Sequence, residues 1–178
     1  MKTFEELKEE LLNRAKNANA CQNGYKMGLD AKNKADLLKA ITANWFWVLI
    51  DARIVDAIYL EENFTEEELS EAGIYTRKCH EVRAVSFACG SATVEAYGSA
   101  TVKACDSATV KAYGSATVEA YDSATVKACD SATVRACDES YVEDCTGNIR
   151  PRYDYAIVKD YHNHKIYIRK GKFEIIEV

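Results

Sequence analysis

The sequence predicts an α+β protein with a helical N-terminal segment, a central β-solenoid and a C-terminal set of strands. Three observations predict this class. Six copies of an octapeptide, [GD]SATV[EKR]A[YC], run without interruption from Gly90 to Cys137. Residues 1–81 show helical apolar spacing and helix caps, whereas residues 146–178 show short alternating runs bounded by turn residues. The predicted parts are therefore residues 1–81, the solenoid over 82–145 and a β cap over 146–178.

Helix signals recur through the first part of the chain. Thr3–Glu6 and Thr65–Glu68 have the spacing of capping boxes, so a helix is expected behind each. Gly24 and Gly28 predict a connection between helices, and another helix is expected from Asn33. An apolar periodicity over residues 54–60 predicts a further helix. The residues expected on the buried side of the Asn33 helix are Leu37, Leu38, Ile41, Trp45 and Leu49.

Three adjacent aromatic residues, Trp45, Phe46 and Trp47, have two interpretations. The first is a core anchor for a small helical bundle. The second is an aromatic docking surface, because three consecutive residues of a helix cannot all face the same side.

Each octapeptide has the pattern of one half-buried strand. Thr and Val are β-branched, and S-A-T-V-x-A places Ala, Val and Ala on one face, with Ser, Thr and a charged residue on the other. The Gly or Asp that opens each copy marks a corner, and an Asp side chain can bond the backbone there. Successive strands without intervening helices predict stacked coils.

The coil is predicted to contain two octapeptides, or 16 residues. One octapeptide spans at most roughly 26 Å of extended chain, too little to enclose a core, whereas Ala and Val are too small to fill a triangular coil of three. The variable position agrees with this period. At a spacing of 16, Lys111 and Lys127 are the one like-charged pair. The oppositely charged pairs are Glu95–Lys111, Lys103–Glu119, Glu119–Arg135 and Lys127–Glu143.

The last octapeptide position holds either Tyr or Cys, and we expect it to be half-buried beside the corner, packed on its equivalent one coil away. Cys129 and Cys145 would then have α-carbons near disulfide range. Free thiols are nevertheless expected, because the seven cysteines are odd in number and Tyr replaces Cys freely. The six positions are Tyr97, Cys105, Tyr113, Tyr121, Cys129 and Cys137.

The ends of the solenoid need covers, because open strand edges would stack into fibres. The helical segment or its Trp45–Trp47 cluster is expected to cover the first coil. Strands at Tyr155–Asp160, Lys165–Arg169 and Lys172–Val178 are expected to cover or extend the last one, beyond a decayed repeat at Glu139–Cys145.

Candidates for chemistry are few. His162 and His164 lack a convincing third metal ligand and are expected in a solvated turn. Cys79 and His80 have nothing to orient them as nucleophile and base. The row Asp106, Asp122 and Asp138 is interpreted as corner capping, with a cation row or an acidic contact edge as the alternative. The charged residue in every copy argues against a flat ice-binding threonine array.

No phosphate-binding glycine loop or nucleophile elbow occurs in the sequence, so we predict a protein that is not an enzyme, without cofactor or metal. The net charge of −5 includes no basic stripe, which argues against direct binding of nucleic acid. The longest apolar run, Trp45–Ile50, is too short for a membrane span. The first ten residues are acidic and amphipathic, whereas a secretory signal would be basic and then apolar. A cytoplasmic location in a bacterial cell is therefore expected.

The copies GSATVEAY, DSATVKAC and DSATVRAC resemble octapeptide-repeat proteins of phages and other mobile elements of gut bacteria. The stretches DLLKAITANWFWVLI and NFTEEELSEAGIY resemble segments that precede such repeats. This group carries no established activity, so the resemblance supplies no functional residues. It implies a phage or mobile-element context, in which accessory proteins are often inhibitors of host defence.

The predicted function is that of an accessory protein that binds another protein through a rigid solenoid surface. The partner is expected to be a host defence nuclease, such as a CRISPR effector. The alternatives are a scaffold that self-associates as a homo-oligomer, and an enzyme using Cys79 with His80 or the two histidines near the C-terminus. The residues predicted to contact a partner are Trp45, Trp47, Tyr97, Tyr113, Tyr121, Asp106, Asp122 and Asp138.

Overall fold

A computed structural model describes residues 1–153 and 155–176 and divides the chain into two compact units, Met1–Ile74 and Tyr75–Val178. We call them the helical unit and the solenoid unit. Two strands, β1 (Ile74–Tyr75) and β2 (Cys79–Val82), occupy the end of the segment predicted to be helical, and β2 ends one residue beyond it. Neither carries the octapeptide motif, but both pair with later strands, so the solenoid begins before its repeats do.

Five α-helices form the helical unit, and side chains cap them as the sequence predicts. The Thr3 hydroxyl accepts from the Glu6 amide while the Glu6 carboxylate accepts from the Thr3 amide, and Thr65 and Glu68 repeat this box. The Asn33 side chain caps the third helix. The helices are α1 (Phe4–Asn17), α2 (Gln22–Asp30), α3 (Lys34–Ala43), α4 (Ala57–Asn63) and α5 (Glu66–Glu71).

Gly24 and Gly28 lie inside α2, so the connection predicted at these glycines is wrong. Both sit where helices approach closely. A β-carbon at Gly28 would lie 3.3 Å from Leu12 Cδ2 in α1, and one at Gly24 would lie 3.1 Å from Asn44 Oδ1. The glycines therefore serve packing of α2 against its neighbours rather than a turn.

A π-helix, η1 (Phe46–Asp51), follows α3 and interrupts the periodicity expected to continue through Trp45 and Leu49. Trp45 is 1% exposed, whereas Phe46 is 49% exposed. Trp45 thus packs as a core anchor of the helical unit. Within the described residues, no helix is both long and apolar enough to cross a bilayer.

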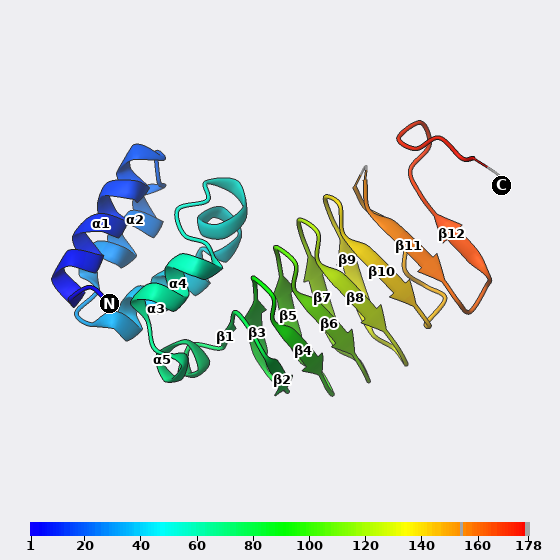
Figure 1. The fold of residues 1–178 in the computed structure, drawn as a ribbon, viewed down its shortest axis with the longest axis horizontal. Coiled ribbons are helices and arrows are strands. Elements are labelled where there is room, and N and C mark those ends of the chain that lie inside the picture. The colour runs from blue at the N-terminus through cyan, green and yellow to red at the C-terminus, as the bar shows by residue number, and fades with distance from the viewer. Residues whose placement is uncertain (154, 177–178) are drawn as a thin grey trace. The chain divides into compact units, whose positions relative to one another are not determined.

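The solenoid unit consists of two sheets whose strands stack one behind another (Figure 1). One sheet has the order β1-β3-β5-β7-β9 and is called sheet A; the other has the order β12-β11-β10-β8-β6-β4-β2 and is called sheet B. The strands within the octapeptides are β4 (Thr93–Ala96), β5 (Thr101–Ala104), β6 (Thr109–Ala112), β7 (Thr117–Ala120), β8 (Thr125–Ala128) and β9 (Thr133–Ala136). The flanking strands are β3 (Val85–Ala88), β10 (Tyr141–Asp144), β11 (Ile157–Asp160) and β12 (Lys165–Tyr167).

The parallel register confirms the coil of two octapeptides. Val94 lies beside Val110 in sheet B, and Val102 lies beside Val118 in sheet A, each 16 residues further along the chain. Consecutive octapeptides therefore alternate between the sheets. The first coil is shorter, since His80 pairs with Val94.

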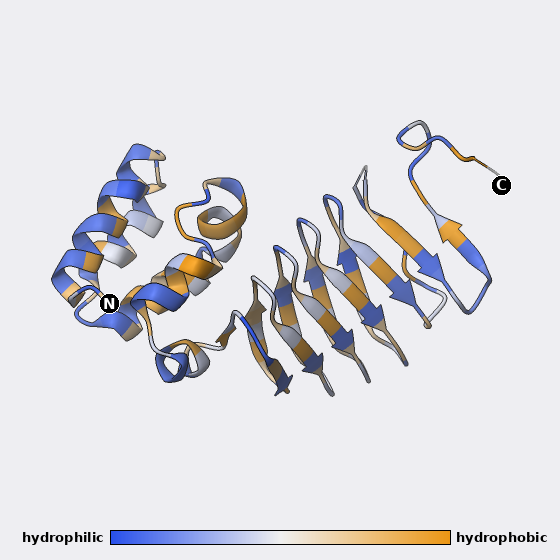
Figure 2. Ribbon diagram, viewed as in Figure 1, coloured by the Kyte–Doolittle hydropathy of each residue, from blue (hydrophilic) through white to orange (hydrophobic). Residues whose placement is uncertain are grey.

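The core between the sheets is the predicted spine of alanine and valine. From Ala92 to Ala128 every inward Ala and Val of the octapeptides is 0% exposed. Figure 2 shows an apolar band that recurs across successive strands. Because these side chains are small, the sheets enclose a core without a large volume to fill.

At both ends of this core, residues outside the octapeptides pack against it, including Tyr75 at the first coil and Tyr167 at the last. At the first coil the rings of Tyr75 and His80 stack with their centroids 4.3 Å apart. At the last coil β11 extends sheet B in parallel and β12 pairs with it antiparallel. The third predicted C-terminal strand is wrong for residues 172–176, which form none, and its last two residues lie outside the described residues.

Candidate functional site

The corners of the coils require a left-handed backbone, which explains the alternation of Gly and Asp in the repeat. Gly90 and Gly114 have φ of 62° and 65°, and Asp106 and Asp122 have φ of 55° and 49°. Glycine adopts this region without a steric penalty, and Asp is one of the few other residues that does so with some ease.

The aspartates at the corners also bond the coil before them. Asp106 Oδ2 accepts from the Gly90 amide at 3.0 Å, and Asp122 Oδ2 accepts from the Asp106 amide at 3.3 Å. Asp138 accepts from the Asp122 amide in the same way. The row Asp106, Asp122 and Asp138 therefore caps the corners, as the sequence predicts, and links each coil to the next.

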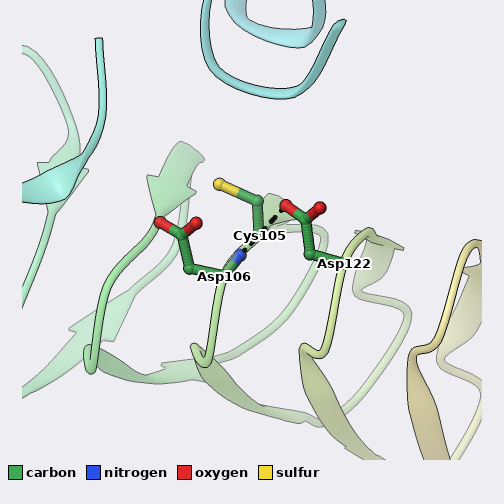
Figure 3. A group of neighbouring side chains, drawn as sticks. All are labelled: Cys105, Asp106 and Asp122. Carbon is green, nitrogen blue, oxygen red and sulfur yellow. Dashed lines mark hydrogen bonds between the residues drawn. The ribbon is translucent and has the colours of Figure 1, made fainter. Parts of the chain in front are cut away.

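Three potential metal-ligating side chains converge on this row. One ligand atom from each of Cys105, Asp106 and Asp122 lies within 4.8 Å of the other two, and Figure 3 shows the Cys105 sulfur between the carboxylates. Cys105 is buried and both aspartates are half-buried. The neighbouring Cys89 thiol, followed by burial, raises the pKa of the Cys105 thiol far above its ordinary value.

The Tyr and Cys positions form two rows, one along each edge where the sheets meet. In one row the rings of Tyr97 and Tyr113 stack with centroids 5.2 Å apart and planes 12° from parallel. The Tyr97 hydroxyl donates to Glu95 at 2.8 Å, and this bond is the largest cause that raises the pKa of Tyr97 to about 12. Tyr121 belongs to the other row and is only 5% exposed. The tyrosines predicted to contact a partner are therefore divided between two edges.

All seven cysteines are free thiols in the structure. Cys129 and Cys145 are neighbours in adjacent coils, and burial followed by the Cys145 thiol raises the pKa of Cys129.

Charged side chains follow the outer faces of both sheets in the predicted register. Lys111 Nζ lies 2.9 Å from Glu95 Oε1 on sheet B. On sheet A, Glu119 lies between Lys103 and Arg135, at 3.9 and 3.8 Å. Exposed pairs of this kind add little stability, about 0–1 kcal/mol each, so they chiefly reinforce register.

The histidines do not assemble into a site with their sequence neighbours. Cys79 and His80 are consecutive in β2, so their side chains point to opposite faces. His80 Nε2 lies 2.8 Å from the Arg77 carbonyl oxygen. His162 and His164 are exposed and lie in the turn between β11 and β12, where the sequence predicts them.

Trp47 lines an apolar cavity of about 230 Å³ inside the helical unit. Leu11, Ile41 and Ile54 contribute to its wall. Trp45 is packed in the core of the unit, so the two tryptophans predicted to contact a partner have different environments.

The sequence analysis does not predict the burial of two carboxylates in the last coil. Asp144 and Asp160 are 0% and 1% exposed and pair in register in β10 and β11. Asp144 Oδ1 accepts from the Thr146 and Gly147 amides, and its Oδ2 accepts from the Ile149 amide at 2.9 Å. One sequence feature could have predicted the buried Asp144. It stands in the decayed repeat at the position where each regular octapeptide has its last alanine.

Comparison with known proteins identifies no relative of this chain. No family model matches the chain, and no match is found among curated proteins or solved structures. A β-solenoid is a fold suited to structural or protein-binding roles, and the outer faces and edges described above are the surfaces that such a role would use.

Proposed function

We propose that the chain is a non-catalytic binding protein that docks a rigid edge of its solenoid onto another protein. The observation that carries this proposal is the stacked pair of Tyr97 and Tyr113. Tyrosine is enriched among the residues that dominate binding energy at protein interfaces, because one ring offers both apolar area and a polar end.

The tyrosine pair is held in place before any partner arrives. Its rings stack on each other, the Tyr97 hydroxyl is bonded to Glu95, and the Arg83 guanidinium lies 5.4 Å from the Tyr97 ring centroid. Both rings are half-buried, so part of each ring is accessible. A side chain that is already ordered loses little entropy on binding, which favours affinity.

The charge of the repeats favours a basic partner surface. Residues 82–145 carry 9 acidic and 5 basic side chains, and three of the nine, Asp106, Asp122 and Asp138, follow the edge opposite the tyrosine pair at about 4.8 Å intervals. Enzymes that process nucleic acids present basic channels of this complementary sign. Together with the resemblance to phage and mobile-element repeats, this supports a host defence nuclease, such as a CRISPR effector, as the partner.

Affinity capture from a bacterial host tests the proposal, using the whole chain and the double variant Tyr97→Ala/Tyr113→Ala as baits. We expect a protein that the unmodified chain enriches and the variant loses by about 10-fold or more, since a hot-spot residue contributes at least about 2 kcal/mol. Thr101→Ala/Thr117→Ala, on the outer face of sheet A, is the control and should retain the partner.

The captured protein should be a nuclease whose cleavage the purified chain inhibits, with inhibition weakening as salt rises. Equal capture by the tyrosine variant and the unmodified chain would refute the tyrosine edge. Enrichment of no protein above an unrelated bait would refute the binding function.

A second candidate, self-association as a scaffold, is favoured by the exposed apolar residues at the end of sheet B. β12 is the last strand in that sheet, and Ile166 within it is 64% exposed. Light scattering over a range of concentrations should then show a mass that grows with concentration, and Ile166→Lys should abolish this growth. Ile58→Lys, a comparably exposed position in α4, should leave it intact. A constant monomer mass for the unmodified chain would eliminate the candidate.

A further inference from the structure

Cys105, Asp106 and Asp122 bring a buried thiol and two carboxylates together at one corner of the solenoid. We propose that they form a binding site for a thiophilic divalent cation of the zinc type. The site is independent of the proposed partner, so either can fail without the other.

The coil geometry creates the cluster from residues that are separated in sequence. Cys105 closes one octapeptide and Asp106 opens the next, which places the two at the same corner. Asp122 is 16 residues beyond Asp106 and therefore occupies the equivalent corner one coil away, about 4.8 Å along the stack. The ligand atoms of the three lie within 4.8 Å of one another. Figure 3 shows the three side chains side by side at neighbouring corners.

Both carboxylates are already oriented by the backbone. The Gly90 amide donates to Asp106 Oδ2, and the Asp106 amide donates to Asp122 Oδ2. Hydrogen bonds of this kind restrict a metal-ligating side chain to few orientations, which lowers the entropy lost on binding an ion.

The donor set selects the class of cation. Zn²⁺ accepts both thiolate and carboxylate ligands, whereas Ca²⁺ and Mg²⁺ prefer sites made of oxygen alone. Binding breaks the S–H bond of Cys105, forms a sulfur–metal bond and releases the proton to solvent. Three protein ligands leave a fourth position for water. The Cys89 thiol is the neighbour of Cys105 on the adjacent coil.

Within residues 1–153 and 155–176, other corners of the solenoid do not reproduce this set. Tyr121 holds the position before Asp122, so the next step of the same row has no thiol. Among the residues that the structure describes, Cys105, Asp106 and Asp122 form the one group of three or more potential ligands at this spacing. In the part of the chain that the structure describes, the repeat thus builds many similar corners but a single mixed thiol and carboxylate cluster.

Cobalt binding to the whole, reduced and metal-stripped chain tests the site, because a thiolate bound to Co²⁺ produces a charge-transfer absorption. We expect a single Co²⁺ per chain with this absorption, which Zn²⁺ displaces and excess Mg²⁺ does not. Cys105→Ser should abolish the charge-transfer band, and Asp122→Asn should weaken Co²⁺ affinity by about 10-fold or more.

Asp138→Asn is the matched control, because Asp138 makes the same bond to a corner amide but lies outside the cluster. It should leave Co²⁺ affinity unchanged, and Cys129→Ser should leave the absorption unchanged. Circular dichroism of each variant establishes that it is folded.

Absence of the charge-transfer band in the unmodified chain would overturn the proposal. An equal loss of Co²⁺ affinity in Asp138→Asn and Asp122→Asn would also overturn it. Co²⁺ would then be binding to the row of aspartates in general and not to the cluster of Cys105, Asp106 and Asp122.

Discussion

At the scale of the residue, the corner position controls how each coil turns and how it joins the next. A left-handed backbone is required there, and the sequence meets the requirement in two ways. Gly98 and Gly114 have no side chain to strain, with φ of 64° and 65°. Asp106 and Asp122 tolerate the conformation and add a hydrogen bond to the preceding coil. At the corners, Gly thus avoids backbone strain, whereas Asp accepts some strain and forms a hydrogen bond that links two coils.

The two glycine corners give a matched pair for measuring crowding. An alanine at either position must adopt a left-handed backbone, which costs about 1–2 kcal/mol of stability. At Gly114 the added β-carbon would also lie 3.2 Å from the Gly98 carbonyl oxygen, whereas at Gly98 nothing lies within 4 Å. Urea denaturation should therefore show a larger loss of unfolding free energy for Gly114→Ala than for Gly98→Ala. The reverse order would contradict this account of the corner.

At the scale of the element, the last coil keeps the inward valines Val142 and Val158 but places a buried carboxylate where each octapeptide has its last alanine. Asp160, at the end of β11, accepts from the Asn163 amide and side chain at 2.9 Å. The Arg150 guanidinium lies 3.8 Å from its Oδ2. The side-chain bond from Asn163 is the largest cause that lowers the pKa of Asp160 below 3.8, although burial opposes the shift. The turn to β12 is therefore stabilised by an ionised carboxylate.

This shift makes the stability of the terminal strands depend on pH. Because the folded pKa lies below the unfolded pKa, the contribution of Asp160 is present above about pH 4 and is lost as pH falls through the folded value. Thermal midpoints measured between neutral and acidic pH should fall less steeply for Asp160→Asn than for the unmodified chain. Asn163→Ala should reduce the acid dependence as well. An unchanged acid dependence in both variants would show that other carboxylates control it.

At the scale of the whole molecule, the solenoid unit is an array in which each coil contacts its neighbours. The octapeptide strands β4 to β9 alternate between the two sheets, so the natural unit of insertion or loss is 16 residues rather than eight. Removing one octapeptide would move every later strand to the other sheet, and Glu119 would then lie beside Glu95. The C-terminal turn at Asp144 would also form on the wrong side.

Deletion of residues 106–121 should leave a folded, shorter solenoid, whereas deletion of residues 106–113 should disrupt the terminal coil. The physical reason is that the free energy of unfolding of such an array is the sum of contributions from each coil and from each interface between coils. The longer deletion removes one whole coil and leaves the remaining interfaces in register. Circular dichroism and thermal unfolding of both variants measure the difference. Equal stability would refute the two-octapeptide coil.

Much of this architecture could be predicted from local patterns. The strand, its buried face and the 16-residue period follow from Ala-Val-Ala and from the charges at the variable position. The helical unit was harder, because Gly24 and Gly28 have the same sequence signature in a turn as in a close helix contact. The π-helix at Phe46–Asp51 has no residue signal of its own, and the closing strands β1 and β2 lack the repeat that identifies the others.

The chain therefore encodes in its local pattern a thin stack of coils, because alternation and residue size act over a few neighbouring residues. The convergence of the three side chains at the corner of Cys105 and the stacking of Tyr97 on Tyr113 were settled only by the folded coils. Contacts across coils join residues 16 positions apart, and their geometry depends on backbone conformation at the corner and on side-chain orientation. Burial of Asp144 and Asp160 has the same origin, since their amide donors come from turns that form only when the last coil closes.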